Sequence, residues 1–256
     1  MLNINTNYAA AFAANAASKV TSDLDTSMER LSTGNRINYA RDDAAGLAIS
    51  TRLENEIKGL ATASRNAADA QSMIDTADGA LKETQSILVR MKELAVQASN
   101  GTLIQSDRDA LDAEFQALEA EIDRINTNTT FAGETLFNGS TKTFQVGVNA
   151  GSSNYIENSI ASMGPHNLGI DSAGADNDAT ATTDNVANAT LTSQANAQAM
   201  MTAVDSAIGS VSAERGKLGA VSNRLSSTMA NLDQVAVNLS ASQGRIQDAD
   251  FAAEAG

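Results

Sequence analysis

The chain has 256 residues, with 17 basic and 31 acidic side chains, a formal net charge of −14 and only 4% aromatic residues. This charge argues against a nucleic-acid partner, which would require a cationic face. The absence of Cys excludes disulfides and thiol chemistry. No run of 18 apolar residues exists, so the sequence predicts no membrane insertion.

Residues 3–33 are rich in Ala and Asn, and apolar residues recur at steps of three and four from Ala10 to Leu31. This spacing predicts an amphipathic helix that ends near Gly34, a residue suited to the position after a helix. Because its apolar stripe consists mostly of Ala, we expect the helix to need partners to stay ordered.

A second helix is predicted to start near Asp42 or Asp43 and to end at Asn100-Gly101. Its later part carries small or apolar residues at alternating steps of four and three, a pattern that keeps one stripe of a helix against a partner. These residues are Ala70, Ile74, Ala77, Leu81, Thr84, Leu88, Met91, Ala95 and Ala98.

A third helix is predicted to begin after Ser106, which has capping-box spacing to Asp109. Its apolar stripe runs from Leu111 to Ile125, and we expect Glu119 and Glu121 to lie on its outer, charged face. More generally, the helical acidic residues are expected on outer faces.

From residue 126 to 162 the pattern changes, and Phe144, Val146 and Val148 alternate with polar residues. With a turn at residues 150–153 and a returning strand at Tyr155-Ile156, this predicts a small β-hairpin. Residues 171–196 are rich in Ala, Asp, Asn and Thr, and predict a surface loop or linker.

The last long helix is predicted over residues 197–246. Its apolar residues recur every seven positions and form a narrow stripe, which a partner helix must bury. They are Val204, Val211, Leu218, Leu225, Leu232, Leu239 and Ile246. We take Leu81, Leu88, Leu218, Leu225 and Leu232 as markers of the seam between the helices.

The sequence predicts no enzyme, cofactor or metal site. His166 is the only His, next to Pro165 in a turn-like stretch, and is expected to be an exposed loop residue. No HExxH, CxxC, GxSxG, P-loop or GxGxxG motif is present. Asp42-Asp43 is interpreted as a helix start. The Asn-x-Ser/Thr triplets at Asn128, Asn138, Asn188 and Asn238 are attributed to chance, because the triplet is short and Asn and Ser are common in this chain.

Several long segments resemble the bacterial flagellins. They begin with residues 4–7 (INTN), 29–38 (ERLSTGNRIN) and 40–49 (ARDDAAGLAI), continue with 91–97 (MKELAVQ) and 131–139 (FAGETLFNG), and end with 215–225 (RGKLGAVSNRL) and 242–254 (SQGRIQDADFAAE). With the heptads, the resemblance implies a mainly α fold: a long antiparallel coiled-coil-like helical bundle with a small β-hairpin region.

The resemblance implies a domain layout named after the inner (D0) and outer (D1) layers of the flagellar filament. Residues 1–40 would form the N-terminal D0 helix, 41–170 the N-terminal D1 helices and hairpin, 171–196 a short variable linker, 197–246 the C-terminal D1 helix and 247–256 the start of the C-terminal D0 segment. The family continues into a further amphipathic helix where this sequence stops at Gly256, so we expect the chain as printed to assemble poorly alone.

By the same resemblance, we expect a secreted, extracellular structural subunit that self-assembles into the flagellar filament for motility and is exported by the flagellar type III apparatus. Recognition by Toll-like receptor 5 would map onto Arg90, Leu94 and Glu114, with Arg90 and Leu94 on one accessible helix face. In the alternative interpretation, Arg90 and Glu114 bridge helices and Leu94 faces a protofilament neighbour. A hook–filament junction protein of the same superfamily is a second possibility, although the motif at residues 131–139 favours flagellin.

Overall fold

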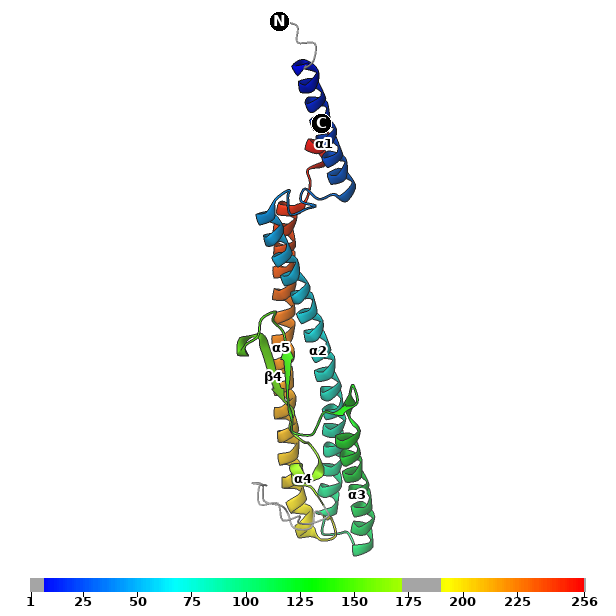
Figure 1. Cartoon of the computed structure of the whole chain (residues 1–256). Coiled ribbons are helices and arrows are strands. Elements are labelled where there is room, and N and C mark those ends of the chain that lie inside the picture. The colour runs from blue at the N-terminus through cyan, green and yellow to red at the C-terminus, as the bar shows by residue number, and fades with distance from the viewer. Residues whose placement is uncertain (1–6, 172–189, 256) are drawn as a thin grey trace. The chain divides into compact units, whose positions relative to one another are not determined.

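The computed structural model describes residues 7–171 and 190–255, and its backbone is mainly α-helical (Figure 1). The helices are α1 (Tyr8–Thr33), α2 (Ala44–Ala98), α3 (Gln105–Asn128), α4 (Pro165–Leu168), α5 (Gln194–Gln247) and α6 (Phe251–Glu254). The strands are β1 (Thr130–Phe131), β2 (Glu134–Thr135), β3 (Thr141–Gln145) and β4 (Tyr155–Ser159), with a short 3-10 helix at Ser152–Asn154. The mainly α prediction with a small β region is confirmed.

Most of the predicted linker, residues 172–189, lies outside the described residues. Its last part is helical, because α5 begins at Gln194, three residues before the predicted start. The chain forms two compact units: Met1–Thr62 with Asn231–Gly256, and Ala63–Ala230.

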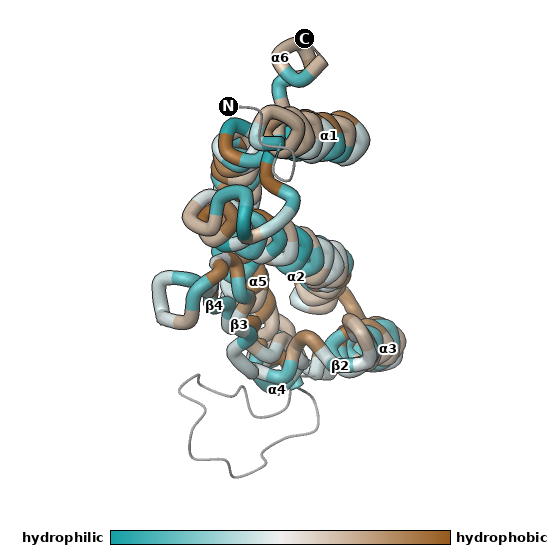
Figure 2. Tube along the Cα trace, turned by 45° about the horizontal axis from the view of Figure 1, so that its top comes forward, coloured by the Kyte–Doolittle hydropathy of each residue, from teal (hydrophilic) through white to brown (hydrophobic). Residues whose placement is uncertain are grey.

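In the unit Ala63–Ala230, α2 and α5 run antiparallel with their apolar seams buried. All nine residues of the predicted α2 stripe are buried, and so are Val204, Val211, Leu218 and Leu225 of α5. Hydrophobic and hydrophilic residues are interspersed in both helices (Figure 2). The predicted seam markers Leu81, Leu88, Leu218 and Leu225 belong to this continuous core, while Leu232 is buried in the other unit.

Polar pairs beside this seam recur every seven residues along α2. Gln71 donates to Ser222 at 2.8 Å, Asp78 accepts from Arg215 at 2.7 Å, Gln85 lies 3.5 Å from Ser212 and Lys92 pairs with Asp205 at 2.5 Å. The partner numbers fall as the α2 numbers rise, so these contacts define the antiparallel register.

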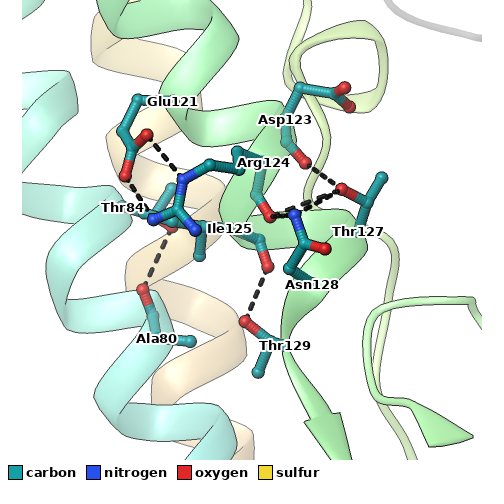
Figure 3. A network of polar contacts seen from close by, with 9 residues as sticks. All are labelled: Ala80, Thr84, Glu121, Asp123, Arg124, Ile125, Thr127, Asn128 and Thr129. Atoms are coloured by element: carbon teal, nitrogen blue, oxygen red, sulfur yellow. Dashed lines mark hydrogen bonds and ion pairs between the residues drawn. The ribbon is translucent and has the colours of Figure 1, made fainter.

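The third helix, α3, starts earlier and with a different cap than predicted. Its first residue is Gln105, and the Asp107 carboxylate accepts from the backbone N–H of Ile104 at 3.4 Å. The Ser106–Asp109 capping box is therefore wrong. At the other end, the side chains of Thr127, Asn128 and Thr129 donate to carbonyls of the preceding turn (Figure 3). Each of these side chains adds a second donor to a carbonyl four residues back, next to the backbone bond of the helix, such as the one from Thr129 N–H to Ile125 O at 3.0 Å.

The predicted hairpin is present, with β3 and β4 antiparallel and Phe144 opposite Ile156. Val146 and Ile156 are buried in the common core. A second, smaller hairpin of β1 and β2 was not predicted. Its turn residues Ala132 and Gly133 have φ of 51° and 85°, and two positive φ values in a two-residue turn match the twist of a hairpin.

In the unit that holds both ends of the chain, Gly34 ends α1 as predicted, with φ of 75°. Asp43 starts α2 by accepting from Gly46 N–H at 2.8 Å. The segment that follows α1 is joined by backbone hydrogen bonds to the end of α5 and to the residues after it, Arg36 N–H to Gln247 O at 2.7 Å and Ala249 N–H to Gly34 O at 2.9 Å.

We predict that Leu225→Asp strongly destabilises the chain. Leu225 is fully buried between the long helices, and an unpaired carboxylate there should cost on the order of 3 kcal/mol or more. Thermal unfolding followed by circular dichroism should show a midpoint lower by roughly 6 °C or more. The control is Ser226→Asp at the exposed neighbouring position. Equal midpoints for the two variants would contradict the seam.

Candidate assembly and receptor-binding surfaces

Arg90 joins α2 to α3 through an ion-pair cluster on the surface of the unit Ala63–Ala230. Its Nε and Nη2 donate to Glu114 Oε1 at 3.0 and 2.7 Å, and its Nη1 donates to Glu93 Oε2 at 3.0 Å. The side chains of Arg90 and Glu114 are 51% and 45% exposed. The hydrogen bonds from Arg90 to Glu114, and then to Glu93, raise the pKa of Arg90 above its ordinary value.

Glu93 is part of this cluster although the sequence reasoning did not single it out. It lies three residues after Arg90 on the same helix, a spacing at which oppositely charged side chains are neighbours. The Arg90–Glu93 pair could therefore have been predicted from its three-residue spacing.

Leu94 does not share the accessible face of Arg90 in the monomer. Its side chain is only 1% exposed and belongs to the core, so the expectation that it is available to a partner is wrong. The buried residues at this level of α2 are Met91, Leu94, Ala95 and Ala98, a stripe wider than the two-helix seam. The stripe is wider because α3 packs beside α2 here, as the Arg90–Glu114 pair shows.

The remaining apolar surface near Arg90 comes from Val89 and Val96. These two residues are seven positions apart on α2 and are 46% and 48% exposed. Arg90, Glu93 and Glu114 therefore lie near apolar side chains that a partner could cover, with the core directly beneath.

In the other unit, α1 has no buried residue. Five of its large apolar side chains lie at multiples of four residues from Tyr8 and are more than half exposed: Tyr8 77%, Phe12 78%, Val20 67%, Leu24 61% and Met28 61%. A helix row with this spacing is a ridge that packs into the groove of another helix. An isolated α1 would leave this ridge in water.

Three acidic residues expected on outer faces are instead buried: Asp112, Glu119 and Glu214. Asp112 accepts from the backbone N–H of Leu191 at 2.6 Å and from Gln116 at 2.8 Å. Glu214 accepts from Ala161 N–H at 3.2 Å and pairs with Lys217 at 2.9 Å. Buried carboxylates need such donors, and here they fix irregular segments to the helices. Glu121 keeps its outer position, paired with Arg124 (Figure 3).

His166 lies in the short helix α4, 37% exposed and 3.8 Å from Asp171. It borders an open polar hollow of about 560 Å³ between α3 and α4, which Glu119 and Asp123 also line. Among residues 7–171 and 190–255, no group of three or more His, Cys, Asp or Glu residues is arranged to hold a metal ion. No described helix is both long and apolar enough to cross a bilayer.

Comparison with known proteins identifies the family. Residues 4–142 match the bacterial flagellin N-terminal helical region, and residues 201–256 match the bacterial flagellin C-terminal helical region. The chain belongs to the bacterial flagellin family. Flagellins are structural subunits of the flagellar filament, so the surfaces that matter here are packing surfaces rather than a catalytic centre.

Relatives match nearly the whole chain. A flagellin of Halalkalibacterium halodurans is 43% identical over 227 residues, which span 89% of this chain and 78% of that protein. A flagellin of Bacillus subtilis is 42% identical over 276 residues, which span 99% of this chain and 89% of that protein.

Solved structures share the fold. The crystal structure of Bacillus cereus flagellin matches with a TM-score of 0.53 and 29% identity, over 66% of this chain and 88% of that one. A putative flagellar hook-associated protein from Vibrio parahaemolyticus matches with a TM-score of 0.64 over 81% of this chain and all of that one, at 16% identity. The second likeness shows the fold alone.

We predict that Asp112→Ala loosens the start of α5 in this flagellin. The Leu191 amide would lose its buried acceptor, which should cost about 1–3 kcal/mol. Hydrogen exchange at Leu191 should accelerate more than exchange in the middle of α2. The control is Glu121→Ala, further along α3 at a residue paired with Arg124, which should leave hydrogen exchange at Leu191 and in the middle of α2 unchanged. Unaltered exchange at Leu191 in Asp112→Ala would rule out this tether.

Proposed function

We propose that the chain is a filament subunit that polymerises with other copies through the exposed ridge of α1 and reaches the cell exterior through the flagellar type III export apparatus. The apolar ridge of α1 is the observation that carries the proposal. Five large apolar side chains on one helix are mostly exposed, and burying each would stabilise association by about 1.5–3 kcal/mol. Other copies of the same helix, or of the chain's other end, are partners of matching chemistry.

The acidic surface is compatible with such polymerisation because apolar contacts do not require opposite charges. A net charge of −14 keeps separate subunits apart in solution. Association then depends on burying apolar area, and added salt should favour it by screening the repulsion.

The test is seeded growth of the monomer on short filament fragments, measured by sedimentation and electron microscopy. Seeds are needed because the chain is expected to assemble poorly alone. Phe12→Asp should reduce incorporation at least tenfold, because Phe12 is 78% exposed in the monomer and its burial is lost. Ser18→Asp is the matched control, since Ser18 is exposed and lies on the opposite side of α1 from Val20. Normal incorporation of Phe12→Asp would refute assembly through this ridge.

A role at the hook–filament junction is the second candidate. The likeness to a hook-associated protein supports a shared helical fold. However, the two relatives that match nearly the whole chain are flagellins, and both matched family regions are flagellin regions. The small hairpin β1–β2 overlaps the motif of residues 131–139 that favours flagellin. We therefore rank the filament subunit first.

We also propose that Toll-like receptor 5 recognises the monomer through the Arg90–Glu114 cluster. In this proposal Leu94 does not contact the receptor but holds the cluster in place from the core. In the monomer, Glu114 accepts both Arg90 bonds on a single carboxylate oxygen, which leaves its second oxygen for a donor of the receptor. Leu94 packs in the core below and keeps α2 and α3 at the spacing that the ion pair spans. Filament packing over the same surface should silence recognition.

A reporter-cell assay with purified monomer tests this second proposal. Arg90→Ala and Glu114→Ala should each lower potency at least tenfold, as expected for a hot-spot residue worth about 2 kcal/mol. Both should fold normally, because an exposed ion pair contributes only about 0–1 kcal/mol. Arg124→Ala removes a comparable exposed arginine that pairs within α3 alone and should retain potency. Full potency of both cluster variants would exclude recognition through this surface.

A further inference from the structure

The chain contains two Asn-Gly dipeptides, Asn100-Gly101 and Asn138-Gly139. In such a pair the backbone nitrogen of Gly can attack the side-chain amide of Asn, because Gly has no Cβ to obstruct the approach. The second dipeptide lies in the turn between β2 and β3, where both residues are exposed and Gly139 has φ of 73°.

The Asn138 side chain is held in an arrangement that favours this attack. Its Oδ1 accepts from Ser140 N–H at 3.0 Å and from Ser140 Oγ at 2.6 Å, so the amide group is folded forward over the Asn138–Gly139 peptide. Among the residues that the structure describes, none accepts a hydrogen bond from the Gly139 N–H. We propose that Asn138 is a site of spontaneous deamidation, promoted by Ser140.

The reaction needs water and no enzyme. The Gly139 nitrogen loses its proton to solvent base and forms a bond to Asn138 Cγ, and negative charge develops on Oδ1. The two donors of Ser140 stabilise that charge, as paired donors do at a tetrahedral intermediate. Solvent then protonates Nδ2, the oxyanion collapses to a carbonyl as the Cγ–Nδ2 bond breaks, and ammonia leaves. The product is a cyclic imide formed by residues 138 and 139. Water opens the imide at either carbonyl, which gives aspartate or isoaspartate at position 138.

The two products differ in their effect on the fold. Aspartate keeps an oxygen that can accept both Ser140 bonds, so the turn should persist with one added negative charge. Isoaspartate adds a methylene to the backbone between the buried Phe137 and the first residue of β3, Thr141. That insertion should disturb the start of β3. Deamidation at Asn138 would therefore slowly alter the hairpin region.

Other asparagines of the chain provide internal references. Asn100 also precedes Gly, but its Oδ1 accepts only from Thr102 N–H, at 3.1 Å. Asn158 is buried within β4 and precedes Ser159, so neither water nor a free turn is available there. Asn138 should therefore deamidate much faster than Asn158. Substitution of Ser140 should change the deamidation rate of Asn138 alone.

The experiment is incubation of the purified full chain at neutral and mildly alkaline pH, followed by peptide mass spectrometry that resolves aspartate from isoaspartate. We expect both products at position 138, a rate that rises with pH, and little change at Asn158. Ser140→Ala should slow the reaction at Asn138 relative to Asn100 by about threefold or more, since one donor to Oδ1 is lost. The Asn138→Asp variant, with an unchanged circular dichroism spectrum, provides the reference peptide.

Two results would overturn the proposal. Asn138 could prove as slow as Asn158, which would show that the turn does not permit attack. Alternatively, Ser140→Ala could leave the ratio of the rates at Asn138 and Asn100 unchanged, which would remove the assigned role of Ser140. Neither result bears on filament assembly, so the proposal stands apart from the proposed function.

Discussion

The structure depends on one packing interaction, the antiparallel contact between α2 and α5 in the unit Ala63–Ala230. Its seam is narrow and consists largely of Ala and Leu, so the two backbones can approach closely. Apolar stripes of this kind are tolerant of sliding by one heptad. The polar pairs at seven-residue intervals, from Gln71–Ser222 to Lys92–Asp205, favour a single register.

Every other part of this unit is attached to that pair of helices. Buried carboxylates hold the irregular segments in place: Asp112 binds the chain before α5, and Glu214 binds the chain after β4. The Arg90–Glu114 pair joins α3 to α2 at the surface. A protein whose fold relies on helix faces in this way can offer its remaining faces to copies of itself, as filament formation requires.

The sequence was sufficient for the elements with strong periodicity. The stripe from Ala70 to Ala98, the αL glycine at Gly34 and the presence of the hairpin that contains Phe144 and Ile156 all follow from local patterns. It was insufficient where a third element decides burial. Leu94 and Glu119 read as surface residues because the heptad describes two helices, whereas α3 and the chain near α4 cover these positions. The Leu191 amide that donates to buried Asp112 lies far away in sequence, so no local pattern predicts that contact.

The most direct test of the antiparallel seam uses the absence of cysteine in the natural sequence. Cysteines at positions 71 and 222 should be joined within one monomer by a short bismaleimide linker, because Gln71 and Ser222 are in hydrogen-bond contact. Cysteines at positions 71 and 205 should not react this way, because 17 residues of helix separate position 205 from 222, about 25 Å. Efficient intramolecular cross-linking of only the first pair, read by mass spectrometry of dilute monomer, is the predicted result. Equal cross-linking of both pairs, or of neither, would contradict the register on which this account rests.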